Sequence, residues 1–515
     1  MNPPLTSLAA RLHRFRQTLS GLDRPRLVFI GFVAVLLAGG AAAALARQPA
    51  LLLPAGLAVG LLVALVEWRW LYYLLFLVLP FSQEIALFGG LSLDVPSEPL
   101  MLALSACVGG ALVLGTGRLP AREWRHPLLV VLALMLLWTA TDTLFSVDGL
   151  KSFKYLLAKV WYLVPFVLGA LLIVRRPHDT WRFAAVYAGA ACLAVLYVAS
   201  RHATQGFSFG QINWALRPFF RNHVIYAAML ALLVPFGLLA LNAARGAGAR
   251  LAWRVALGLL LFGLLTSYTR ASILSLPIAA LFYGAMRLRL TRALLAAAAL
   301  GTTMSVAYFV AGDRFMEYAP DYEHTVFNGK NFEKHLEATY QMKDVSGMER
   351  VYRWVAAARM IADKPVTGSG AATFYPEYKR YTIKSFRTYV SDNPEKSTTH
   401  NYFLLQLAEQ GIPGFVLFLT LVATALLTAE NLYHRAHARP EVRRVVLAAT
   451  LSLVVIIFHL TLNELVEVDK IGPVFFICLA LLVRCETWLA EDAEGGTESN
   501  KQNVMPSAAE APRFG

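Results

Sequence analysis

A titratable side chain stands where a long polar segment of the sequence ends and an apolar segment begins. His400 is followed by Asn401 and then by a run typical of the start of a helix. An imidazole has an ordinary pKa of about 6.5, so its neutral form is available at neutral pH to accept a proton. A positioned general base typically contributes a rate factor of about 10²–10⁴. His400 is therefore a candidate general base, although a loop histidine taken alone is more often an ordinary surface residue.

Four arginines are candidate ligands for an anionic substrate. Arg270 lies in a tight corner between two apolar runs, where a permanent charge is costly. Arg217 and Arg221 precede a run that begins at His223, and helix N-termini attract phosphate groups. Guanidinium groups bind phosphate oxygens bidentately, and Arg350, at the start of an amphipathic segment, fits the same role. The alternative for these arginines is an anchor at the lipid headgroups or a solvated surface charge.

Two acidic pairs are the candidates for a metal site. One residue separates Asp321 from Glu323, and one residue separates Glu467 from Asp469. Hard cations accept oxygen ligands alone, but neither pair has a histidine at ligand spacing. The four cysteines form no Cys-x-x-Cys motif, which argues against structural zinc. The sequence therefore predicts no metal and no other cofactor, and arginines would stabilise developing negative charge instead.

The composition of the chain is that of a membrane protein. Its 515 residues are 57% hydrophobic, and the mean hydropathy is +0.53. Several apolar runs are long enough to cross a hydrocarbon core of about 30 Å as helices, and their continuity excludes a transmembrane β-barrel. The net charge of +14 comes largely from arginines scattered over short loops, which argues against nucleic acid as a partner.

These runs predict an all-α polytopic membrane protein with 12–14 transmembrane helices. Lys and Arg cluster before the first run and again near 118–125, 175–182, 287–292 and 435–444. With fourteen spans all five clusters fall on one side, which the positive-inside rule makes cytoplasmic, together with both termini. The candidate spans are 27–46, 50–66, 70–87, 99–116, 127–142, 156–174, 183–200, 223–242, 254–268, 271–286, 293–312, 412–428, 445–462 and 472–488.

The polar segments define the domain organisation. Between 347 and 363, apolar residues recur every three to four positions, which predicts an amphipathic helix ended by Pro365. The last residues are polar and predict a disordered cytoplasmic tail. We expect N-terminal transmembrane helices at 1–312, an external helical loop at 313–411, C-terminal transmembrane helices at 412–488 and the tail at 489–515.

Three motifs between residues 217 and 414 resemble those of one enzyme family. The stretch from His400 to Gly411 is similar to the signature H-N-x-x-L-x-x-x-x-E-x-G, with Glu409 as its acid. The stretch that starts at Arg350 is similar to the pattern R-x-x-x-W…P-x-x-G-x-G, and the corner at Arg270 is similar to S-R-x-x, with Thr269 replacing serine. These patterns resemble the O-antigen ligase family, in a superfamily with O-antigen polymerases and bacterial protein O-oligosaccharyltransferases.

The resemblance implies a multi-helix membrane glycosyltransferase in the bacterial inner membrane. Such enzymes transfer a glycan from undecaprenyl diphosphate, at the periplasmic leaflet, to an acceptor, which for the ligase is a sugar hydroxyl of lipid A–core. It implies that His400 is the functional histidine and that Arg270 and Arg350 are essential, whereas Arg217 and Arg221 match less closely. It also implies a reaction without metal or nucleotide. The partners would be the lipid-linked glycan, lipid A–core and membrane lipids.

On this hypothesis the arginines hold the diphosphate while His400 takes the proton of the acceptor hydroxyl. The hydroxyl attacks the anomeric carbon from the opposite face, so that its configuration is inverted. His223 supports the site, and Asn401 orients the histidine or binds a sugar. Glu409 pairs with an arginine or sets the imidazole tautomer.

Other functions stay open at this point. A polymerase that extends the glycan on its lipid carrier and a protein O-oligosaccharyltransferase are the alternatives within the superfamily. A lipid or glycan transporter is the alternative from a different class. Transporters usually carry charged or broken helices at mid-membrane, whereas these spans are nearly free of central charges. The sequence therefore favours an enzyme, and a ligase among the enzymes.

Overall fold

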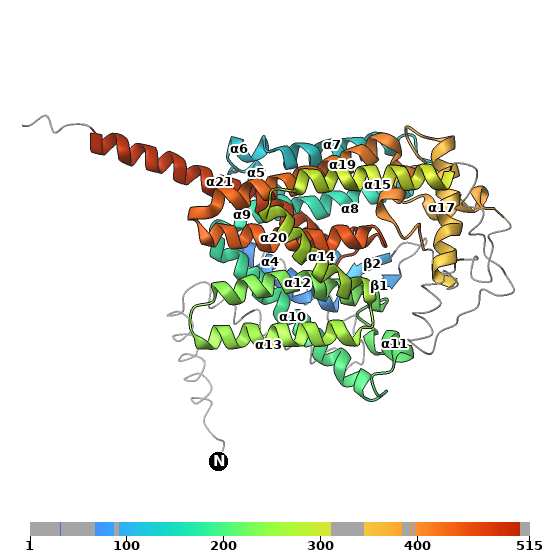
Figure 1. Ribbon diagram of the computed structural model, residues 1–515, viewed down its shortest axis with the longest axis horizontal. Coiled ribbons are helices and arrows are strands. Elements are labelled where there is room, and N and C mark those ends of the chain that lie inside the picture. The colour runs from blue at the N-terminus through green and yellow to red at the C-terminus, as the bar shows by residue number, and fades with distance from the viewer. Residues whose placement is uncertain are drawn as a thin grey trace, which may run out of the picture.

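The computed structural model describes residues 31, 67–86, 92–310, 345–383, 393 and 397–504. This part of the chain is almost entirely helical (Figure 1), which confirms the predicted fold class. Strands β1 (Gln83–Ala86) and β2 (Ser92–Val95) pair antiparallel, and they form the one sheet within the described residues.

The membrane region is a bundle of long helices. Within the described residues, seven helical segments are long and apolar enough to cross a membrane, and three shorter apolar helices accompany them. The helices are α4 (Arg69–Val78), α5 (Ser97–Val113), α7 (Pro127–Thr143), α8 (Gly149–Leu163), α9 (Ala170–Ile173), α10 (Pro177–Ala203), α12 (His223–Ala243), α13 (Ala247–Thr266), α14 (Arg270–Arg287), α15 (Thr291–Val310), α19 (Tyr402–Arg435), α20 (Pro440–Leu460) and α21 (Gly472–Val504).

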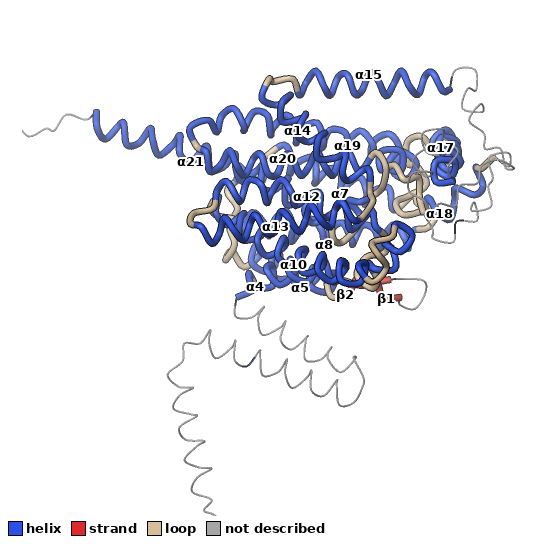
Figure 2. The backbone as a smooth tube through the Cα atoms, turned by 60° about the horizontal axis from the view of Figure 1, so that its bottom comes forward, coloured by secondary structure: helices blue, strands red, loops and turns tan. Residues whose placement is uncertain are grey.

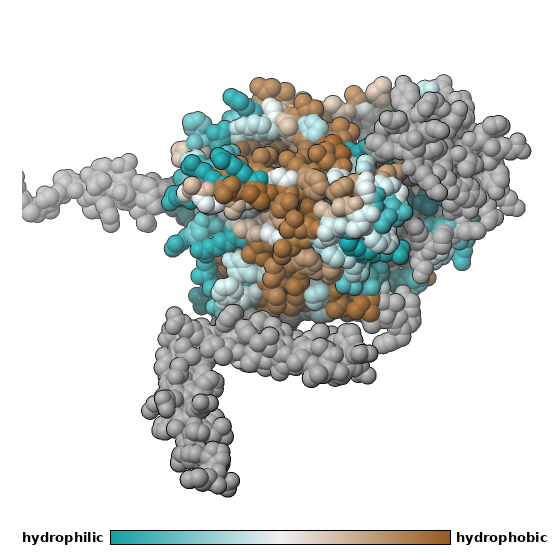
Figure 3. Space-filling view, turned by 90° about the horizontal axis from the view of Figure 1, so that it is seen from below, coloured by the Kyte–Doolittle hydropathy of each residue, from teal (hydrophilic) through white to brown (hydrophobic). Residues whose placement is uncertain are grey.

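The predicted spans from 99–116 to 472–488 each fall on one or more of these helices. The span predicted at 70–87 is helical only up to Phe81, because residues 83–86 form strand β1. The spans 27–46 and 50–66 lie outside the described residues, apart from Gly31, so the total of 12–14 stays a prediction. Figure 3 shows a hydrophobic band across one face of the bundle, with hydrophilic residues on either side of it. This is the surface that a lipid bilayer requires.

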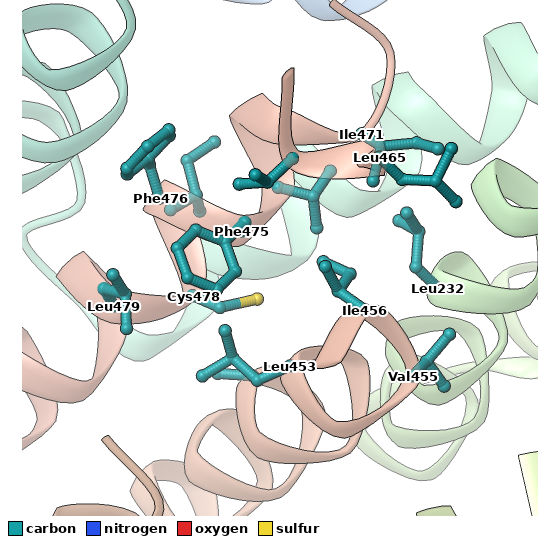
Figure 4. Close-up of a cluster of buried hydrophobic side chains, with 14 of the residues drawn as sticks. Leu232, Leu453, Val455, Ile456, Leu465, Ile471, Phe475, Phe476, Cys478 and Leu479 are labelled. Carbon is teal, nitrogen blue, oxygen red and sulfur yellow. The ribbon is translucent and has the colours of Figure 1, made fainter. Parts of the chain in front are cut away.

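Burial sorts the helices into central and peripheral ones. A helix that is apolar on all sides is stable in the interior of a bundle, and α12 and α21 are of this kind. By contrast, α13 is mostly exposed, and α15 lies along the outside of the bundle (Figure 2). Figure 4 shows the core where α12, α20 and α21 meet. Leu465 and Ile471, from the connection between α20 and α21, pack into this core.

The two ends of the bundle differ in chemistry. At one end, arginines of two of the sequence clusters contact α21. The Trp488 indole donates to the backbone oxygen of Arg175 at 2.9 Å, and Arg435 pairs with Glu486 at 3.0 Å. At the other end lie the hairpin β1–β2, the short helix α11 (Ile212–Leu216) and α17 (Val345–Asp363), which crosses the end of the bundle (Figure 1). We call this second end the site end.

The polar segments depart from two sequence predictions. Helix α17 confirms the amphipathic helix predicted at 347–363. The predicted span 412–428 lies within the longer α19, which begins at Tyr402 and is broken at Gly411. The disordered tail predicted at 489–515 is wrong up to Val504, because α21 continues to that residue. Alanine and glutamate, both strong helix formers, follow the membrane-spanning part of α21. Residues 311–344 and 505–515 lie outside the described part.

The remaining elements are short. Three helices connect or cover the longer ones: α6 (Ala121–Trp124), α18 (Phe374–Glu377) and the π-helical η4 (Val164–Gly169), which joins α8 to α9. The single 3₁₀ turns are η2 (Leu79–Phe81), η5 (Phe209–Gln211), η7 (Tyr378–Tyr381), η9 (Ala436–Ala438) and η10 (Leu465–Glu467).

Candidate functional site

His400 lies at the site end, directly before α19. Its backbone φ of +52° is left-handed, a conformation that costs a non-glycine residue about 1–3 kcal/mol. Such strained residues cluster at functional sites. Asn401 caps α19, because its side-chain oxygen accepts from the backbone N–H of Leu404 at 3.0 Å. The Asn401 side chain thus fixes the start of the helix, whereas the sequence suggested that it orients His400 or binds a sugar.

Helix α17 holds the His400 segment from the other side. The Trp354 indole donates to the backbone oxygen of Thr399 at 2.8 Å. Burial, helped by the positive charges of Arg353 and Arg350, lowers the pKa of His400 to about 4, and the Asn463 side chain acts in the opposite direction. His400 is therefore a neutral imidazole at neutral pH, with the proton-accepting form fully populated.

Two arginines of α17 contribute to this site. Arg350, predicted from the sequence, is half-buried near His400. Arg353 is buried and pairs with Glu349, also buried, at 3.3 Å. The sequence motif includes Arg353, but only Arg350 was expected to bind substrate. The structure brings both positive charges close to the imidazole, so this region suits an anionic substrate.

Arg270 begins α14 and is linked to the His400 region through α20. The buried hydroxyl of Thr269 donates to the backbone oxygen of His223 at 3.2 Å, which joins the starts of α14 and α12. One turn further on, Ser272 shares a hydrogen bond of 2.9 Å with His459, near the end of α20. The connection that follows α20 approaches His400. Arg270 and His400 therefore lie at the same end of the bundle.

Arg221 and Arg217 lie in a different environment. The Arg221 guanidinium pairs with Glu84 at 2.9 Å and with Asp94 at 3.4 Å, both in the β hairpin. Arg217 and Arg221 line a cavity of about 340 Å³ together with Asp94 and the buried Lys470. Because carboxylates already compensate the charge of Arg221, it is a weaker candidate for diphosphate than the sequence indicated.

His223 opens α12 beside this cavity. Its Nδ1 lies 3.1 Å from the side-chain oxygen of Asn213, and its backbone N–H donates to the same oxygen. The neighbouring Asn222 caps the helix. His223 therefore holds the α11 region against the start of α12, which agrees with a supporting place in the site.

The sequence suggested that Glu409 pairs with an arginine or sets the imidazole tautomer, but the structure shows a different set of contacts. Its buried carboxylate accepts backbone N–H groups of Ala372 at 2.9 Å and of Phe374 at 2.8 Å. These bonds fasten the turn after α17 to the first part of α19. The Glu409 carboxylate is therefore engaged by backbone groups, because the segment that follows the Gly-x-Gly turn presents the N–H groups of Ala372 and Phe374 to it.

The motif glycine Gly411 belongs to the same junction. Its φ of +64° is left-handed, and a Cβ there would lie 2.0 Å from the backbone oxygen of Val366. Only glycine permits this close approach of two backbone segments.

The acidic pair considered for a metal is engaged with cations. Glu467 accepts from Lys159 at 2.6 Å, and Asp469 pairs with Lys470 at 3.2 Å. Among the described residues, no group of three or more His, Cys, Asp or Glu side chains is placed to hold a metal ion. The pair Asp321 and Glu323 lies outside the described residues, and the absence of a cofactor stays a prediction.

Glu464 is the residue near His400 that the sequence reasoning missed. Its carboxylate lies 3.9 Å from the imidazole Nδ1. Glu464 follows a strongly apolar helix in the stretch Asn463-Glu-Leu-Val-Glu-Val-Asp-Lys470. The presence of three acidic residues in so short a connection could have drawn attention to Glu464. Only Glu467 and Asp469, however, are spaced like the ligands of a metal ion.

Fold and site define a multi-pass, all-helical membrane protein with a histidine and several arginines gathered at one end. Residues 255–419 match the family model described as O-antigen ligase, and this segment contains Arg270, Arg350 and His400. This match supports the O-antigen ligase family that the motifs predicted, a family of glycosyltransferase-like membrane enzymes. Arg217, Arg221 and His223 precede the matched segment. No curated protein matches the chain significantly.

Proposed function

We propose that the protein is an O-antigen ligase. It transfers O-antigen glycan from undecaprenyl diphosphate to a sugar hydroxyl of lipid A–core, at the periplasmic face of the bacterial inner membrane. Both termini are cytoplasmic in this proposal, since the arginine clusters lie at the end opposite to His400. Family membership supports lipid-linked glycan and lipid A–core as the general substrates.

One observation carries the proposal: a neutral, strained histidine is placed beside two arginines at the end of a membrane bundle. The low pKa of His400, about 4, keeps a lone pair available for the acceptor proton. Arg350 and Arg353 supply positive charge within the same region. A leaving diphosphate gains negative charge in the transition state, and fixed guanidinium groups stabilise it there.

In this proposal the reaction proceeds by substrate binding, proton transfer and displacement of the diphosphate. Arg350 and Arg270 bind the diphosphate oxygens, with Arg217 at the neighbouring cavity. His400 accepts the proton of the acceptor hydroxyl while that oxygen bonds to the anomeric carbon. The bond from the anomeric carbon to the diphosphate oxygen breaks, and its electron pair leaves with the diphosphate. Attack from the face opposite to the leaving group inverts the anomeric configuration.

The test is a reconstitution of the purified protein in vesicles with undecaprenyl diphosphate–glycan and lipopolysaccharide that lacks O-antigen. A ladder of glycan-capped lipopolysaccharide, formed with EDTA and without nucleotide, supports the ligase. Longer lipid-linked chains without capped lipopolysaccharide would instead identify a polymerase. A requirement for added divalent metal would contradict the metal-independent reaction.

A pair of histidine variants makes the test specific. His400→Ala is expected to lower transfer at least about 100-fold, because it removes the general base. His178→Ala is the control, since His178 is exposed on α10 near the arginine clusters. Wild-type transfer by His400→Ala would refute the catalytic role.

A further inference from the structure

Glu464 presents a carboxylate to the imidazole from the connection between α20 and α21. Besides the contact of 3.9 Å to Nδ1, the carboxylate accepts the backbone N–H of His400. The Glu464 side chain is only 19% exposed. Nδ1 of His400 is buried and has no hydrogen-bond partner within the described part of the chain. An acceptor therefore stands next to a buried imidazole nitrogen that has no hydrogen-bond partner among the described residues.

The position of Glu464 is fixed by its own segment. Leu465, the next residue, and Ile471 are buried in the core between α20 and α21 (Figure 4). Three residues after Glu464, Glu467 accepts the Tyr402 hydroxyl at 2.7 Å. Tyr402 lies two residues after His400, so this hydrogen bond also joins the two segments. A side chain held in this way can orient another one precisely enough for catalysis.

Charged and polar groups from two other segments surround the pair of His400 and Glu464. Arg350 and Arg353 approach from α17, and Asn463 lies beside His400. Burial raises the pKa of Glu464 to about 7, and backbone N–H groups and the two arginines oppose this rise. Glu464 therefore changes its charge near neutral pH, whereas His400 is already neutral there.

We propose that Glu464 is a positioning residue for His400, an inference that rests on the proposed function. The ionised carboxylate accepts a hydrogen bond from Nδ1–H when the contact shortens in the substrate complex. This bond fixes the tautomer in which Nε2 carries the free lone pair. Nε2 then takes the acceptor proton, and the carboxylate stabilises the imidazolium that results. The proton stays on Nε2, and the broken anomeric bond leaves its electrons on the diphosphate.

The first arm of the test compares Glu464→Gln with the wild type in the transfer assay. Glutamine keeps the size and an acceptor oxygen but loses the charge. We expect kcat to fall about 10- to 100-fold with KM for the lipid donor nearly unchanged. The wild-type rate should rise with pH through about 7, and the variant should lose this rise. Glu377→Gln is the control, because Glu377 pairs with the exposed Arg380.

The second arm needs no transfer activity. Carbethoxylation of His400 by diethyl pyrocarbonate is followed by peptide mass spectrometry, with the exposed His178 as internal reference. Glu464→Gln is expected to slow labelling of His400 at pH 8 at least about threefold and to leave His178 unchanged. Unchanged His400 labelling, or an unchanged pH profile of transfer, would overturn the inference. If the wild type transfers no glycan, the proposed function fails and labelling alone decides the role of Glu464.

Discussion

The Tyr402 hydroxyl donates a hydrogen bond of 2.7 Å to Glu467, which joins the His400 segment to the connection between α20 and α21. Glu467 also accepts from the Tyr155 hydroxyl at 2.9 Å and from Lys159 at 2.6 Å, both on α8. One carboxylate thus holds three separate segments together behind the candidate site. Among these three donors, only Lys159 carries a positive charge that compensates the Glu467 carboxylate.

This arrangement predicts that removing one charge of the Lys159–Glu467 pair destabilises the protein more than removing both charges. Lys159→Met leaves the partly buried Glu467 without its cation, and we expect a loss of unfolding free energy on the order of 3 kcal/mol. Lys159→Met combined with Glu467→Gln removes both charges and should recover part of that loss. Intrinsic tryptophan fluorescence during thermal unfolding measures both. A double variant less stable than Lys159→Met would show that Glu467 stabilises the fold independently of Lys159.

Two glycines provide a second prediction. Gly411→Ala introduces a methyl group against the Val366 oxygen and forces a residue with φ of +64°. We expect a loss of several kcal/mol or failure to accumulate as folded protein. Gly258→Ala, in α13, meets no atom within 4 Å and should be neutral or stabilising by up to about 1 kcal/mol. Yields from membranes and unfolding temperatures compare the two. Equal tolerance of both changes would contradict the close packing of α17 and α19.

The fold was largely predictable because long apolar runs leave few alternatives in a membrane. The predicted spans from 99–116 onward all fall on helices, and the amphipathic period of 347–363 identified α17. The span predicted at 70–87 is helical only in its first part, since it ends in strand β1. Helix ends were less predictable. Gly411 and Pro413 mark a break inside α19 rather than the start of the helix, which lies at Tyr402, and backbone contacts with Val366 and Pro365 stabilise this junction.

Site residues could be predicted only where they belong to a short sequence motif. His400 and Arg350 were predicted because they belong to short patterns, and the structure brings them close together. Glu464 was missed because its partner is 64 positions earlier in the chain, and no local spacing reports such a contact. Arg221 was overrated for a related reason. Its partners Glu84 and Asp94 come from a distant hairpin whose pairing is not evident from sequence.

Arginines of α17 give a third prediction. Arg350→Ala is expected to raise KM for the lipid-linked donor about 10- to 100-fold, because a charge-assisted bond to phosphate contributes about 1.5–3 kcal/mol. Arg359→Ala, on the same helix, removes an exposed arginine that donates to the backbone oxygen of Tyr381, and should change KM less than about twofold. Initial rates at varied donor concentration distinguish the two. Similar KM values for Arg350→Ala and the wild type would remove Arg350 from the donor site.

A fourth prediction concerns stability as a function of pH. Glu464 has a pKa of about 7 in the folded protein and an ordinary value of about 4.5 when unfolded. Between these values the folded state binds more protons than the unfolded state, so its stabilising contribution is present at low pH and is lost as pH rises through 7. Glutamine does not titrate. Relative to the wild type, Glu464→Gln should therefore become more stable from pH 6 to pH 8 by about 1 kcal/mol.

The measurement is the unfolding temperature of both proteins in the same detergent at several pH values between 5 and 9. Only the difference between the proteins is used, because other groups titrate in both. His400 works in the opposite sense: its pKa of about 4 means that its contribution is lost as pH falls below 6.5. A difference between Glu464→Gln and wild type that is constant from pH 6 to pH 8 would mean that Glu464 ionises well outside this range, and its charge could not then control the tautomer of His400 near neutral pH.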